Sequence, residues 1–259
     1  MDFKYDVKSE TKLKALILTH GVVFTDKALS LAKMKNAKGQ NLIYNKPQKA
    51  EKNRPQELLL QNLTDGYETV VSCVSPSISE NAVVIDAIDD KLFLQDINSS
   101  DVAVSYVREP SYYRQLLTNG EYVKDYVSAC GLDELNIFPW KGCSISRCCK
   151  FCGSNNFVKA DTLNAHEITQ LKWNELKSDY LSNLREAIDM AKLDDCYSHH
   201  MHVILIAGNL SNNLLDLESQ IFIDITENIH SIIKDKATEG IVLVITPPSN
   251  LDYLKRIRQ

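Results

Sequence analysis

The chain of 259 residues lacks an apolar run long enough to cross a membrane. Runs such as Val203–Ala207 and Ile241–Ile245 are about five residues long, whereas a membrane helix needs about 20. A basic surplus is also missing, because 29 Lys and Arg residues stand against 34 Asp and Glu residues, for a net charge of −5. This composition predicts neither a membrane nor a nucleic-acid partner, since binding along nucleic acid requires positive charge that neutralises phosphates.

Common nucleotide-binding and hydrolase motifs are missing as well. The sequence has no Gly-x4-Gly-Lys phosphate loop, no Gly-x-Gly-x2-Gly fingerprint and no Gly-x-Ser-x-Gly nucleophile elbow.

The first residues, Met-Asp-Phe-Lys-Tyr-Asp, lack the apolar core of a secretory signal. We therefore expect a cytoplasmic protein whose thiols stay reduced.

Apolar residues make up 44% of the chain, enough for a globular core. Residues 1–132 predict an N-terminal α+β accessory domain. Within it, residues 82–88 and 91–96 form an expected hairpin joined at Asp89-Asp90. Residues 111–129 are expected to be helical.

Residues 133–259 alternate between strand and helix patterns and predict an α/β domain. The expected strands are 135–138, 202–207 and 241–245, and amphipathic helices follow the first two of them. A third helix is expected over 251–257. Three β-then-α units in succession predict parallel strands joined by right-handed crossovers.

The seven cysteines are unevenly spaced, and four of them fall within ten residues: Cys143, Cys148, Cys149 and Cys152. In a reducing compartment, crowded thiols are typical of a metal site rather than of disulfides. The other three stand alone: Cys73, Cys130 and Cys196. We assign no chemistry to these three.

The cysteine-rich loop resembles the cluster-binding loop of the radical S-adenosyl-L-methionine (radical SAM) superfamily, in which Cys-x3-Cys-x2-Cys follows the first barrel strand. Cys149-Lys150-Phe151-Cys152 matches the second half of that motif, with an aromatic residue directly before the last cysteine. The first half is widened, because five residues separate Cys143 from Cys149. Cys148 is the alternative middle ligand and would give gaps of four and three residues.

The resemblance extends to the end of the second strand. There, Ala207-Gly208-Asn209 occupies the place of the glycine-rich segment whose backbone contacts the methionyl amino group of S-adenosylmethionine. One glycine is present where the family usually has two. Residues from about Leu135 onward carry the resemblance, which is about half of the chain.

The resemblance implies that Cys143, Cys149 and Cys152 bind a [4Fe-4S] cluster whose fourth iron chelates S-adenosylmethionine, with Phe151 near the adenine. An electron donor such as flavodoxin or ferredoxin would drive cleavage to a 5'-deoxyadenosyl radical that acts on an unidentified substrate. The family barrel has six βα units, and three are found here. We therefore expect a partial, apparently truncated barrel, or a partner chain that completes it.

A non-catalytic zinc- or iron–sulfur-binding module is the alternative. Cys149-x2-Cys152 is a common zinc half-site. The remaining ligands would come from Cys143 or Cys148 and from His199, His200 or His202. Against this alternative, a zinc ribbon usually has a second matching cysteine pair, and an electron-transfer cluster needs a fourth cysteine at recognisable spacing.

Overall fold

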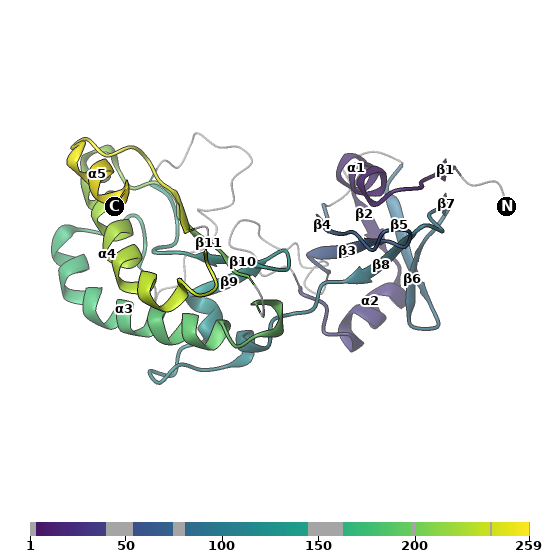
Figure 1. Ribbon diagram of the computed structural model, residues 1–259, viewed down its shortest axis with the longest axis horizontal. Coiled ribbons are helices and arrows are strands. Elements are labelled where there is room, and N and C mark those ends of the chain that lie inside the picture. The colour runs from purple at the N-terminus through teal and green to yellow at the C-terminus, as the bar shows by residue number, and fades with distance from the viewer. Residues whose placement is uncertain are drawn as a thin grey trace. The chain divides into compact units, whose positions relative to one another are not determined.

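The computed structural model describes residues 4–39, 54–74, 81–144, 163–197, 200–238 and 240–258. The described chain divides into two compact units at Glu109 and Pro110 (Figure 1). Residues before this point form unit 1, and residues after it form unit 2. No described helix is long and apolar enough to cross a membrane.

Unit 1 combines two helices with short strands. Its elements are β1 (Tyr5–Asp6), α1 (Glu10–His20), β2 (Val22–Phe24), α2 (Asp26–Met34), β3 (Glu57–Asn62), β4 (Glu68–Ser72), β5 (Val83–Ile88), β6 (Lys91–Leu94), β7 (Ile97–Asn98) and β8 (Val102–Tyr106). The strands form two three-stranded sheets, in the orders β2-β5-β6 and β4-β3-β8, and the pair β1-β7. Both helices and both three-stranded sheets contribute to one hydrophobic core.

The hairpin predicted at Asp89-Asp90 is confirmed. Strands β5 and β6 are antiparallel, with Ile88 opposite Lys91. Both aspartates have positive φ angles, 47° and 62°. Two successive residues in this left-handed region form the turn whose twist matches that of a two-residue hairpin, and Asp tolerates it better than most residues.

A buried ion pair lies at the edge of the unit 1 core. Lys38 follows α2, and its Nζ lies 2.7 Å from Oε2 of Glu57, the first residue of β3. The two side chains are only 1% and 3% exposed. Because water reaches neither charge, each depends on its protein partners.

Replacing Lys38 by Met would remove the cation and leave the Glu57 carboxylate in its buried position. We expect this change to lower the free energy of unfolding by about 3–5 kcal/mol, measured by urea denaturation. The matched variant Lys33→Met, on the exposed surface of α2, should change it by less than about 0.5 kcal/mol. Equal effects of the two variants would contradict this account.

Unit 2 is built around one four-stranded sheet. Its elements are η2 (Ser111–Arg114), η3 (Val123–Asp125), β9 (Val127–Cys130), β10 (Glu134–Ile137), α3 (Gln170–Ala191), η5 (Asp195–Tyr197), β11 (His202–Ile206), η6 (Asn212–Leu214), α4 (Leu215–Ile233), β12 (Ile241–Val244) and α5 (Asp252–Arg258). The strand order is β12-β11-β10-β9. Strands β10, β11 and β12 are parallel, as predicted, and β9 is antiparallel to β10.

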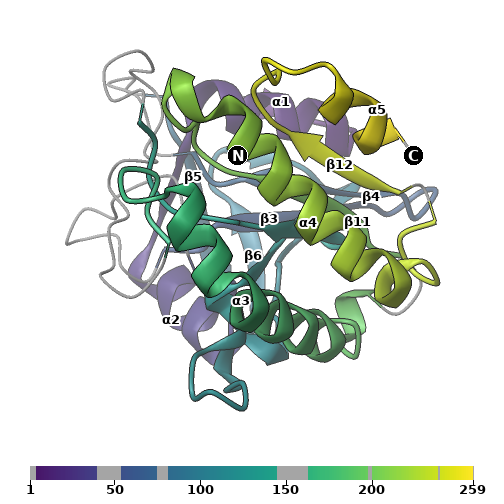
Figure 2. The same ribbon diagram turned by 90° about the vertical axis from the view of Figure 1, so that its left-hand side faces the viewer.

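Alternate residues of the parallel strands form the core of unit 2. Leu135, Ile137, Val203 and Leu205 are fully buried and share one hydrophobic cluster with residues of α3 and α4. The two helices pack side by side (Figure 2). The sheet is open within the described residues, so the partial barrel of the radical SAM type stays a prediction.

The segment before β10 does not have the structure that its sequence predicted. The helix predicted over 111–129 is wrong, because the segment forms two short 3-10 helices and then β9. Gly120, with a φ of 84°, lies in a turn between them. Tyr112 and Val123 belong to the core of unit 2, so this unit begins before the boundary expected at residue 132.

Candidate functional site

Four of the predicted site residues lie in the described chain, at the carboxyl edge of the unit 2 sheet. Cys143 follows β10, and Ala207, Gly208 and Asn209 follow β11. The other predicted residues, Phe151, Cys149 and Cys152, lie outside the described residues, as does the alternative ligand Cys148.

The structure brings Cys143 into direct contact with Gly208. A Cβ atom on Gly208 would lie 2.2 Å from the carbonyl oxygen of Gly142 and 2.6 Å from Cβ of Cys143. Only glycine allows the two loops to approach this closely. The loops after β10 and β11 therefore form one packed surface at this edge.

Two hydrogen bonds hold these loops together. The indole N–H of Trp140 donates to the carbonyl oxygen of Gly208 at 2.6 Å. The backbone N–H of Ser144 donates to the carbonyl oxygen of Asn209 at 2.8 Å. Trp140 is buried and packs edge-on against Phe222 of α4. The position of Cys143 is thus set by the chain on both sides of it.

Replacing Gly208 by Ala would place a methyl group against the Gly142 carbonyl and force the loops apart. We expect the free energy of unfolding to fall by about 1–3 kcal/mol, together with faster hydrogen exchange at the Ser144 amide. The same substitution at Gly39, where a Cβ would meet no atom within 4 Å, is the control. Unchanged stability and exchange in Gly208→Ala would contradict the contact.

The chain on either side of residues 145–162 is also held together. The Lys141 N–H donates to the Leu163 carbonyl, and the Ala165 N–H donates to the Lys141 carbonyl, both at 2.8 Å. The Ser144 hydroxyl donates to the Ala165 carbonyl at 3.3 Å. The described residues on either side of the segment that carries Cys148, Cys149 and Cys152 therefore lie together at this edge of the sheet.

Sequence reasoning missed a buried carboxylate that joins the loops after β11 and β12. Glu218, in the first turn of α4 and 2% exposed, accepts hydrogen bonds from the backbone N–H groups of Leu210 at 3.0 Å and Thr246 at 2.8 Å. The Asn209 amide nitrogen donates to the Thr246 hydroxyl at 2.6 Å. The only sequence signal was an acidic residue in the first turn of an expected helix.

Within the described ranges, no three His, Cys, Asp or Glu side chains gather as a metal site. His202 begins β11 opposite Glu134, the first residue of β10, whereas Cys143 lies beyond the other end of these strands. Four residue steps along β11 correspond to about 13 Å. This separation disfavours His202 as a zinc ligand beside Cys143, and His199 lies outside the described residues.

The isolated cysteine of unit 1 is chemically protected. Cys73 is 4% exposed, and burial raises the pKa of its thiol to about 12. The nearby Arg54 and Glu57 charges act in opposite directions on this pKa. Cys143 is partly exposed.

We expect iodoacetamide to modify Cys143 at pH 8 in the reduced, metal-free protein before it modifies Cys73. The thiolate is the reacting species, and a thiol with a pKa near 12 is about one part in ten thousand thiolate at pH 8. Peptide mass spectrometry over a time course measures both rates, and unfolding in urea should abolish the protection of Cys73. Equal native rates would refute the burial argument.

Comparisons of the chain with protein-family models, with curated proteins and with solved structures found no match. Functional inference for this chain therefore depends on its cysteine motif and on the geometry of the two loops. Those two observations concern the same edge of the sheet.

Proposed function

We propose that this chain is a radical SAM enzyme or a fragment of one. Cys143, Cys149 and Cys152 would hold a [4Fe-4S] cluster, and the backbone at Gly208 and Asn209 would contact S-adenosylmethionine. The contact between Gly208 and Cys143 is the observation that carries this proposal. It unites the two segments on which the family resemblance depends.

The location of this contact also supports the proposal. In folds built of successive βα units, functional residues lie in the loops that follow the carboxyl ends of the parallel strands. Cys143 and Gly208 follow two neighbouring parallel strands at that edge. A cofactor bound there would meet both loops at once.

The proposed donor set fits an iron–sulfur cluster chemically. Thiolates are the usual ligands of such clusters, and three of them leave one iron of a four-iron cluster free. When bound with S-adenosylmethionine, the cluster supplies one-electron cleavage of the sulfonium to a carbon radical. An unidentified substrate and an electron donor such as flavodoxin or ferredoxin would complete the reaction, and a partner chain would complete the barrel.

The described residues would position the site and exclude water from one side. Trp140 anchors the Gly208 carbonyl through its indole N–H and fills the space against α4. Glu218 fixes the backbone at Leu210 and Thr246. Both side chains are buried and form their hydrogen bonds with the backbone of these loops rather than with water.

Anaerobic reconstitution with iron and sulfide tests the proposal. We expect about four irons per chain and a reduced-cluster electron paramagnetic resonance signal that shifts when S-adenosylmethionine is added. Single Ala substitutions of Cys143, Cys149 and Cys152 should abolish the cluster. Cys148→Ala and Cys130→Ala are the matched controls and should retain it.

Three outcomes would overturn parts of this proposal. Loss of the cluster in Cys148→Ala but not in Cys149→Ala would make Cys148 the middle ligand. One equivalent of bound zinc, with no cluster under any reconstitution condition, would favour the non-catalytic zinc module. A stable cluster whose spectrum ignores S-adenosylmethionine would favour an iron–sulfur module without radical chemistry.

A further inference from the structure

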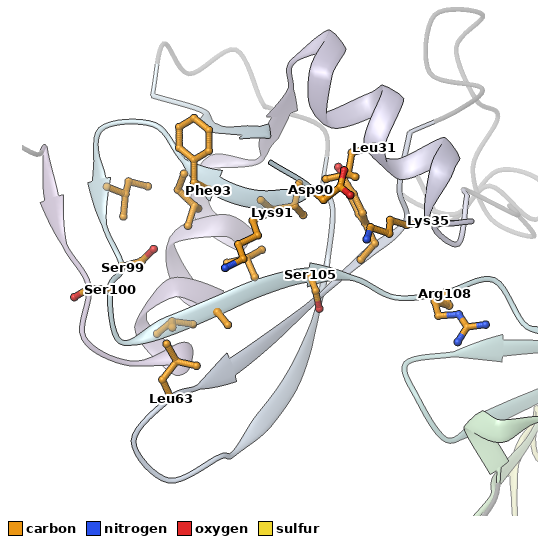
Figure 3. Close-up of a pocket in the computed structure, with 17 residues that line it drawn as sticks. Leu31, Lys35, Leu63, Asp90, Lys91, Phe93, Ser99, Ser100, Ser105 and Arg108 are labelled. Atoms are coloured by element: carbon orange, nitrogen blue, oxygen red, sulfur yellow. The ribbon is translucent and has the colours of Figure 1, made fainter. Parts of the chain in front are cut away.

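Unit 1 contains a cavity of about 870 Å³ between the edges of its two three-stranded sheets. Strand β6 is the last strand of one sheet, β8 is the last strand of the other, and both line the cavity (Figure 3). Its wall is largely apolar, and its volume lies in the upper part of the range of about 300–1,000 Å³ that ligand sites occupy.

The backbone of β8 has one edge directed toward this cavity. The Leu63 N–H donates to the Asp101 carbonyl at 2.9 Å, and Gln61 lies opposite Ala103. Because the residues of an antiparallel strand bond alternately to either side, residues 101, 103 and 105 bond to β3. The N–H and C=O of Val104 therefore face away from β3, toward β6.

The backbone of β6 faces the cavity from the other side. The Gln95 N–H donates to the Val84 carbonyl at 3.0 Å, which fixes the alternation along the β5–β6 ladder. By the same rule, Leu92 and Leu94 direct their N–H and C=O groups away from β5. In the part of the chain that the structure describes, no ladder joins β6 to β8.

Three cationic side chains line the same cavity: Lys35, Lys91 and Arg108. All three are exposed, and none forms an ion pair with a described residue. Asp90 is the single acidic residue among the lining residues. The charge at the cavity is therefore complementary to an anionic partner.

We propose that the cavity binds an extended, acidic peptide segment that pairs its backbone with the edge of β8 that no described strand occupies. A hydrocarbon chain would fill the apolar space but would leave the N–H and C=O groups of Val104 without partners, which is unfavourable away from water. An added strand satisfies them, and its alternate side chains reach the apolar wall and the cationic residues. This proposal does not depend on the radical chemistry of unit 2.

Fluorescence polarisation of the full chain with three fluorescein-labelled octapeptides tests it. The peptides alternate Val with Glu, with Ser or with Lys. We expect the Glu peptide to bind most tightly, the Lys peptide most weakly, and the affinity for the Glu peptide to fall as salt rises. The Glu peptide with alternate amides N-methylated should not bind, because it cannot form the ladder.

The double variant Lys91→Glu/Arg108→Glu should weaken binding of the Glu peptide by roughly tenfold. Lys12→Glu, a single charge reversal on α1 outside the cavity lining, should leave binding unchanged, and equal unfolding midpoints would show that both variants fold. Absence of peptide binding, equal affinity for the Glu and Lys peptides, or undiminished binding of the N-methylated peptide would overturn the proposal. Tight binding of a fluorescent fatty acid with no peptide binding would assign the cavity to a lipid instead.

Discussion

The candidate site of unit 2 depends on a backbone contact that only glycine permits. Gly208 lies against Gly142 and Cys143 so closely that a single methyl group would overlap a carbonyl oxygen. The contact fixes where the loop after β10 meets the loop after β11, and the bonds from Trp140 and Ser144 hold that arrangement. Rigid support of this kind lowers the entropy that a loop loses when it binds a ligand.

The buried carboxylate of Glu218 extends this support to the third strand. It accepts one N–H from the loop after β11 and one from the loop after β12. A carboxylate in the first turn of a helix also interacts favourably with the helix dipole, which offsets part of the cost of burying its charge. Hydrogen bonds thus connect the loops that follow all three parallel strands. A displacement of one loop would therefore disturb the hydrogen bonds of the next.

The sequence predicted the parts of the fold that depend on local pattern. Continuous apolar runs at 202–207 and 241–245 marked parallel strands, and Asp89-Asp90 marked a hairpin. It failed where distant contacts decide. Tyr112 belongs to the unit 2 core, and β9 exists because it pairs with β10. Likewise, the partners of Glu218 are backbone groups up to 28 residues away, which no local pattern reveals. The resemblance drew attention to Gly208, but the steric reason for a glycine there comes from the structure.

The charges at the unit 1 cavity have two physical explanations that can be separated. Lysine on an unpaired strand edge discourages edge-to-edge aggregation, so Lys91 on β6 would be useful even without a ligand. A positive or a negative charge gives this protection equally well, because two identical edges repel each other whichever sign they carry. Recognition of an acidic segment requires positive charge. Reversing the charge at Lys91 and Arg108 therefore preserves the first effect and removes the second, so the sign of the charge, rather than its presence, distinguishes a binding edge from a merely protected one.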